Sequence, residues 1–310
     1  MPEYRVLPQG NPILFFGRTL YDARQQAMFF NWSASGFRLA FEGARLEAEM
    51  VAFAETFPGE GPNLPYIAVF ADGAPQPAQT LRVEEGVSRV TLFAGDQPGA
   101  HTLRVVKRSE NSKGRLGLRA LWTDGRLTAP PAPEARLKLE FVGDSITCGF
   151  GNDMAAEETV FDVAKENVFT AYPAVTAGLL NADYQCVCIS GIPLCWASDP
   201  EYRLRLPAFD GFTPPVRAME HHYACADRNH EEAMGLTEGF TPWDFARFRP
   251  DAVILNLGTN DAFRLRVSGC SPEEEAHFIR RYEAFLRQVR RLNGPAPVIA
   301  CTLGSMDYYL

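Results

Sequence analysis

The sequence contains no run of about 18 consecutive apolar residues, the length that a membrane-spanning helix needs. Cationic residues are in the minority, with 30 Lys and Arg against 38 Asp and Glu and a formal net charge of −8. Nucleic-acid binding depends on clustered positive charge, and no Lys/Arg-rich face is visible. We therefore expect neither a membrane nor a nucleic acid as a partner, while the oligomeric state stays open.

Signals for a particular compartment are equally sparse. The N-terminus lacks a basic start followed by an apolar stretch, so we expect either a cytoplasmic protein or a secreted one whose signal has been removed. The seven cysteines are an odd number without a Cys-x-x-Cys pair, which argues against a disulfide framework and a zinc ribbon. Cys186 and Cys188 would share one face of a buried strand as reduced thiols, which favours a reducing compartment.

Two domains are expected from 310 residues with 46% hydrophobic content. Residues 1–128 lack helical periodicity and show short alternating runs between turn signals such as Asp72-Gly73, which predicts a β-sandwich of the jelly-roll type. Its Trp32 or Trp122 could serve a carbohydrate-binding face, but a scaffold role is the preferred interpretation. Residues 129–134 form a proline-rich linker, and 135–310 form the second domain.

The second domain opens with a strand that runs into a tight turn. Its sequence, LKLEFVGDSITCGFG from Leu137 to Gly151, changes from apolar residues to Gly143-Asp144-Ser145 within a few positions. A turn at the carboxyl end of a strand in an α/β sheet lies where such folds bind ligands. Ser145 is therefore a candidate nucleophile, although Gly-Asp-Ser is also ordinary turn chemistry.

A second stretch of the sequence supports Ser145 as the nucleophile. Ala252 to Leu257 form a continuous apolar run of the buried parallel-strand type, ending at Gly258-Thr259-Asn260-Asp261. Parallel strands that end in such turns place them at the same edge of the sheet. A hydroxyl on one turn and an amide donor on another form the pairing that acyl transfer needs.

These motifs resemble a known superfamily. GDSIT at 143–147, the Ser190-Gly191 pair and LGTND at 257–261 are similar, in order and spacing, to the SGNH (GDSL-like) hydrolases. The segments AYPAVTAGLLNADYQ and WDFARFRPDAVILNLGTND, with an all-β region before them, look like carbohydrate esterase family 2, acetyl esterases that act on plant polysaccharides.

The resemblance implies an α/β fold with a flavodoxin-like parallel sheet and a carbohydrate acetyl esterase (acetylxylan esterase) activity. Ser145 would be the nucleophile, and the N–H groups of Ser145 and Gly191 with the Asn260 side chain would form the oxyanion hole. We interpret Asp144 and Asp261 as structural residues that bind backbone N–H groups in their turns. No cofactor is expected.

One departure from the family concerns the general base. The family's catalytic histidine lies near the C-terminus, usually three residues after an aspartate, and none of the five histidines here is in that place. Four strand-like runs are visible where a flavodoxin-like sheet has five. We therefore expect the sequence to be a fragment of a longer product; a base from another position is the lesser alternative.

The remaining candidates lie around the expected crevice. Trp196 could stack on a sugar ring or serve only in packing. Residues 197–242 read as a long insertion of the kind that forms lids. Its side chains His221, His222, Cys225 and His230 fit no standard metal spacing, so we expect a surface loop and no metal.

Two other functions stay open. The first is a different ester chemistry on the same scaffold, as in a lipase, thioesterase or lysophospholipase, for which a large apolar crevice would be the indication. The second is a non-catalytic carbohydrate-binding protein, which the missing histidine keeps in consideration.

Overall fold

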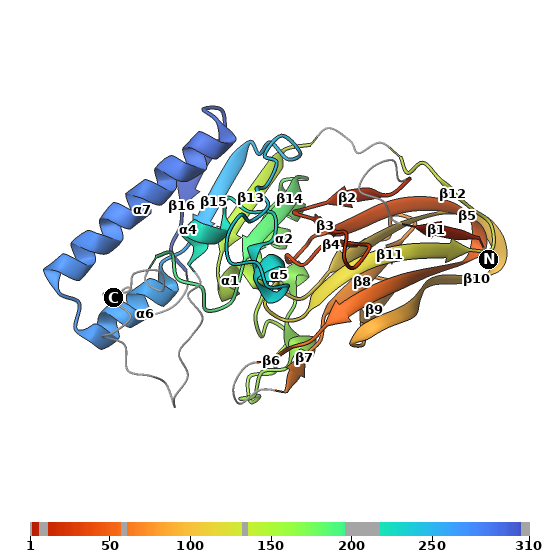
Figure 1. The fold of residues 1–310 in the computed structure, drawn as a ribbon, viewed down its shortest axis with the longest axis horizontal. Helices are drawn as coiled ribbons and strands as arrows, with labels where there is room; N and C mark the ends of the chain where they lie inside the picture. Colours follow the sequence, from red (N-terminus) through yellow and green to blue (C-terminus); the bar gives the residue numbers. More distant parts are fainter. Residues whose placement is uncertain (1, 6–11, 57–60, 132–135, 196–217, 305–310) are drawn as a thin grey trace. The chain divides into compact units, whose positions relative to one another are not determined.

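The computed structural model describes residues 2–5, 12–56, 61–131, 136–195 and 218–304. The chain forms two compact units (Figure 1): residues 1–136 with 149–170, and residues 137–148 with 171–310. Residues 149–170 thus group with the first unit, although they follow the serine turn in the sequence. Among the described residues, no helix is both long and apolar enough to cross a membrane.

The first unit is β-rich, which confirms the class predicted for this region. Its main sheet has the antiparallel order β3-β4-β11-β5-β10-β8-β9, with β1 on β11 and both β2 and β12 on β5, and β6 pairs with β7 apart from it. The strands are β1 (Glu3–Arg5), β2 (Leu14–Phe16), β3 (Leu20–Asp22), β4 (Ala27–Phe29), β5 (Gly36–Phe53), β6 (Glu55–Thr56), β7 (Pro62–Asn63), β8 (Tyr66–Ala71), β9 (Gln79–Arg82), β10 (Gly86–Lys107), β11 (Arg115–Thr123) and β12 (Arg126–Thr128).

The core of the first unit follows from alternation along its two longest strands. In β5, Phe37, Leu39 and Phe41 are 0% exposed, and they pack with apolar side chains of β10 such as Leu92 and Leu103. This pattern places every second side chain inside, as a pleated strand requires.

The second unit contains a four-stranded parallel sheet in the order β14-β13-β15-β16, which confirms the predicted parallel sheet. Its strands lie within one residue of the strand-like runs that the sequence shows at 137–142, 184–189, 252–257 and 298–302, because buried parallel strands read as continuous apolar segments. The elements are β13 (Lys138–Gly143), α1 (Ser145–Cys148), α2 (Tyr172–Leu179), β14 (Asp183–Cys188), α4 (Met219–His222), α5 (Arg228–Ala233), β15 (Ala252–Asn256), α6 (Thr259–Ser268), α7 (Pro272–Asn293) and β16 (Val298–Cys301).

The longest helix, α7, begins and ends as its sequence indicates. Ser271 caps it through a capping box, in which its hydroxyl accepts the Glu274 N–H at 3.2 Å and the Glu274 carboxylate accepts the Ser271 N–H at 2.8 Å. Gly294 follows with a φ of +79°, a conformation that favours glycine. Phe285 and Val289 are buried at helical spacing, so α7 lies with its apolar face inward.

Candidate active site

Three turns of the second unit leave the sheet at the same level. Gly143, the last residue of β13, pairs with Cys188 of β14 on one side and with Asn256 of β15 on the other. Ser145, Gly191 and Asn260 follow these three paired positions by two, three and four residues. The sheet register therefore brings the three predicted site residues to one edge, as expected from parallel strands.

The serine turn depends on the absence of a side chain at Gly143. A Cβ there would lie 1.9 Å from the Thr147 hydroxyl oxygen and 2.9 Å from the Asn256 carbonyl oxygen, so a larger residue would push the turn away from β15. Ser145 begins α1 and is partly exposed. Its hydroxyl is hydrogen bonded to none of the described residues.

The backbone donors predicted for the oxyanion hole are available. Neither the Ser145 N–H nor the Gly191 N–H donates to another described residue. Gly191 has a φ of +74° and is exposed, so a residue with a side chain would be strained at this position. Two N–H groups without partners at the edge of a sheet can hold an oxygen that gains negative charge.

The Asn260 side chain lies beside the serine turn, in the first turn of α6. Its Nδ2 donates to the Ile192 carbonyl oxygen at 3.0 Å and makes a longer contact of 3.4 Å with Asp144 Oδ2. The amide group has two N–H donors, and the first bond holds one of them toward the Gly191 loop. The contact with Asp144 is the longer and weaker of the two. The N–H that makes this contact is therefore the one that can turn to donate to a bound oxyanion.

The two aspartates predicted to be structural are both fully buried. Asp144 Oδ1 accepts the Ile146 N–H at 3.1 Å, which holds the turn around Ser145. Asp261 accepts the N–H groups of Leu194 at 2.7 Å and Cys195 at 3.3 Å, and so links the loop after Gly191 to α6. Burial raises the pKa of Asp144 to about 6, against the lowering effect of its hydrogen bonds from Ile146 and Thr259.

The raised pKa of Asp144 predicts a pH-dependent stability. Because the folded-state pKa of about 6 exceeds the usual 3.8, the folded protein holds this proton more tightly than the unfolded chain between those values. Ionisation of Asp144 therefore destabilises the fold as pH rises from about 4 to 6, by about 3 kcal/mol at most. We expect Asp144→Asn to gain stability relative to the wild type over this interval, measured as urea-unfolding midpoints at several pH values. A difference between the two proteins that does not change with pH would contradict the assignment.

The structure describes two of the three tryptophans that the sequence suggested as sugar-binding residues. Trp196 lies outside the described residues. Trp32 is 0% exposed, and Trp122 is 8% exposed with the Arg89 guanidinium 3.8 Å from its ring centroid. A sugar-binding face built on either tryptophan is therefore wrong, because neither ring offers an open face.

The described part of the insertion is more ordered than predicted. His222 ends the short helix α4 and His230 lies in α5, and each is only 1% exposed. The expectation of a surface loop is wrong for His222 and His230, since α4 and α5 turn these two side chains inward, whereas His221 of α4 is exposed. Within the described residues, the side chains of His221, His222, Cys225 and His230 do not gather as a set of metal ligands.

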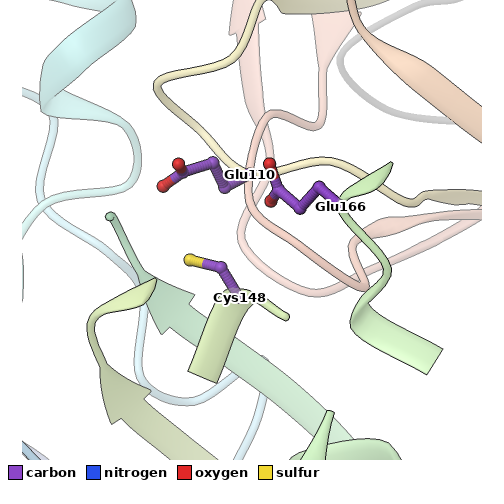
Figure 2. Close-up of side chains that lie close together, drawn as sticks. All are labelled: Glu110, Cys148 and Glu166. Atoms are coloured by element: carbon purple, nitrogen blue, oxygen red, sulfur yellow. The ribbon is translucent and has the colours of Figure 1, made fainter. Parts of the chain in front are cut away.

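A pair of buried acidic side chains was not predicted. Figure 2 shows Glu110 and Glu166 of the first unit, which each have a carboxylate oxygen within 4.8 Å of one on the other. The figure also labels Cys148, which belongs to the second unit. Both glutamates are 0% exposed. They are 56 positions apart in the chain, and single glutamates in polar segments give no sequence signal of burial.

Two family models match the chain. Residues 15–133 match the model described as carbohydrate esterase 2 N-terminal, and residues 141–309 match the GDSL-like lipase/acylhydrolase family, which is more than half of the chain. The chain belongs to the GDSL-like lipase/acylhydrolase family. Within this family, its relatives are family 2 carbohydrate esterases, as the resemblance predicted.

Two curated relatives and one solved structure illustrate the likeness. Cellulase/esterase CelE of Acetivibrio thermocellus is 32% identical over 276 residues, covering 89% of this chain and 29% of CelE. An acetylxylan esterase / glucomannan deacetylase of Cellvibrio japonicus is 28% identical over 286 residues, covering 90% of this chain and 68% of that protein. The structure of a family two carbohydrate esterase from Clostridium thermocellum in complex with cellohexaose has 28% identity and a TM-score of 0.71, covering 95% of this chain and 78% of that one.

Proposed function

We propose that this protein is a serine esterase that removes acetyl groups from plant polysaccharides or oligosaccharides of the xylan type. The observation that carries the proposal is the edge of the parallel sheet, where the turns after β13 and β14 carry the backbone N–H groups of Ser145 and Gly191, neither of which has a described partner. The names of the two curated relatives, which include an acetylxylan esterase, support acetyl groups on a polysaccharide as the substrate.

The proposed reaction has two steps. In the first, the Ser145 hydroxyl oxygen attacks the acetyl carbonyl carbon, its proton passes to a base, and the carbonyl oxygen becomes an oxyanion held by the N–H groups of Ser145 and Gly191 and by the Asn260 amide. Collapse of this intermediate breaks the bond to the sugar oxygen, which leaves with a proton. In the second step, water attacks the acetyl-enzyme and releases acetate.

The base that accepts the Ser145 proton is proposed to be a histidine imidazole, as the family resemblance implies. None of the residues assigned to the site above fills this role. A histidine base has an ordinary pKa of about 6.5, so kcat/KM would rise with pH through that value. Asp144 titrates in a similar range, with a pKa of about 6. The Asp144→Asn variant separates the two groups, because an inflection that belongs to an imidazole persists in it.

Finer features of the fold belong to the same proposal. We propose that the first unit is a jelly-roll sandwich, which is supported by its antiparallel pairing and by β5 and β10, strands of 18 and 22 residues that are long enough to take part in two layers. We also propose that the second unit has flavodoxin-like topology, since β14-β13-β15-β16 corresponds to the order 2-1-3-4.

The function is tested by offering the purified protein acetylated xylan, together with 4-nitrophenyl esters of acetate, butyrate and octanoate, and measuring acid release. The proposal predicts acetate release from the polymer and a preference for acetyl over the longer acyl groups. Preference for octanoate would indicate a lipase or related acylhydrolase. Binding of xylan without release of any acid would indicate a carbohydrate-binding protein.

A further inference from the structure

The segment after the serine turn forms a closed loop within the first unit. The Asn167 N–H donates to the Gly149 carbonyl oxygen at 3.0 Å, and the Asp153 N–H donates to the Lys165 carbonyl oxygen at the same distance. The Asp153 carboxylate also accepts the Asn167 side-chain amide at 3.0 Å and pairs with Arg108. Because both ends and the interior are tied together, the loop between residues 149 and 167 holds its side chains in place.

This loop presents a stacked pair of aromatic rings. Phe150 and Phe161 lie parallel, with ring centroids 3.7 Å apart and planes 11° apart. The Lys113 ammonium lies 5.0 Å from the Phe161 centroid and 5.8 Å from the Phe150 centroid, within the range of a cation–π contact. Phe150 is nevertheless 38% exposed. Since Phe161 covers one face of the Phe150 ring, the exposed area lies on its other face and edge.

The charge of the loop limits what can bind there. Glu157, Glu158 and Asp162 are exposed carboxylates, and only Glu158 has a described ion pair, with Lys165 at 3.0 Å. These carboxylates disfavour an acidic polysaccharide through like-charge repulsion, but not a neutral one. The flat faces of a β-linked pyranose are lined with C–H groups, so they are apolar surfaces that suit an aromatic ring.

We propose that Phe150 is a stacking platform for a pyranose ring of a neutral, β-linked polysaccharide. This inference rests on the proposed function, because it identifies the substrate class as a polymer that is neutral along its main chain. Phe161 and Lys113 are positioning residues that hold the platform, and the closed loop pre-organises it, which lowers the entropy cost of binding.

The test is the affinity of the full chain for soluble, unacetylated xylan, measured by isothermal titration calorimetry. Phe150→Ala is expected to weaken binding about fivefold to tenfold, whereas Phe150→Tyr is expected to keep it because the flat ring remains. Val160→Ala removes a neighbouring apolar side chain that is 81% exposed, and is the matched control that should bind like the wild type. Polygalacturonate, an anionic glycan, is expected to bind more weakly than xylan to all of these proteins.

Two outcomes would overturn the proposal: equal xylan affinity of Phe150→Ala and the wild type, or tighter binding of polygalacturonate than of xylan. A kinetic measurement adds an independent readout, since Phe150→Ala should lower kcat/KM on acetylated xylan about fivefold to tenfold more than on 4-nitrophenyl acetate. The binding assay needs no turnover. Failure of the esterase proposal, seen as no acid release by the wild type, is therefore distinguishable from failure of the platform.

Discussion

Ser145→Ala is expected to lower kcat for acetyl ester hydrolysis by a factor on the order of 10⁴ to 10⁶, because it removes the atom that forms the acyl-enzyme. The side chain is partly exposed and its hydroxyl has no described hydrogen bond, so its loss leaves no buried group without a partner. The fold should therefore survive the substitution. Initial rates on 4-nitrophenyl acetate, at equal concentrations of folded protein, measure the effect.

The control for this variant is Ser88→Ala, which removes a hydroxyl of β10 in the first unit. That hydroxyl is buried without a hydrogen bond to the described residues, so its removal is expected to change neither activity nor folding. Retention of more than about a tenth of the wild-type rate by Ser145→Ala, with an unchanged unfolding midpoint, would exclude Ser145 as the nucleophile.

Asn260→Ala is expected to lower kcat by about 10² to 10³, the effect of removing one donor from an oxyanion hole. KM should change little, because the oxyanion exists only in the transition state and the intermediate. The argument rests on the Asn260 amide, which the bond to Ile192 at 3.0 Å holds near the serine turn while its contact with Asp144 at 3.4 Å is long. Steady-state kinetics on 4-nitrophenyl acetate separate the two constants.

Loss of the bond to Ile192 is a structural consequence of the same substitution. The thermal unfolding midpoint of Asn260→Ala therefore has to be measured beside its kinetics. An unchanged kcat would remove Asn260 from the oxyanion hole. A raised KM with an unchanged kcat would instead assign its amide to ground-state binding of substrate.

The parallel sheet of the second unit was predictable because its strands are short apolar runs that end in glycine turns. β15 and the turn at Gly258 are an example: the continuous run from Ala252 predicts a buried strand, and the structure has β15 over Ala252–Asn256. Helix α7 was predictable from its serine cap, its glutamates in the first turn and its arginines in the last turn: these signals predict a helix over 271–292, and the structure has Pro272–Asn293. The apolar run of β15 and the cap of α7 each lie within a short stretch of chain, so they can be recognised in a single sequence.

Contacts between distant residues were not predictable in the same way. Glu140 occupies a core position of β13 at 0% exposure, where its carboxylate accepts the Gln185 amide at 2.6 Å and the Tyr223 hydroxyl at 2.5 Å. A glutamate inside an apolar strand reads as a surface position, because burying it requires partners that only the fold brings together. Burial of His222 and His230 escaped prediction for the same reason.

The candidate site also has a part that was predictable from local sequence and a part that was not. The turns that carry Ser145 and Asn260 are visible as sequence motifs, and the resemblance to a family linked them to Gly191. The contact of Asn260 with Asp144, and the burial that raises the pKa of Asp144 to about 6, depend on side-chain packing across two strands. The proposed platform at Phe150 likewise depends on its partner Phe161, which is 11 residues away in an irregular loop.

The central claim is that Ser145 becomes acetylated during turnover. The most direct test is to quench the reaction with 4-nitrophenyl acetate in its first turnovers, digest the protein, and map the modified residue by mass spectrometry. The account predicts one added acetyl group on the peptide that contains Ser145, absent from Ser145→Ala and lost after the substrate is exhausted. Hydrolysis that proceeds while this peptide stays unmodified, or an acetyl group that turns over on another residue, would contradict it.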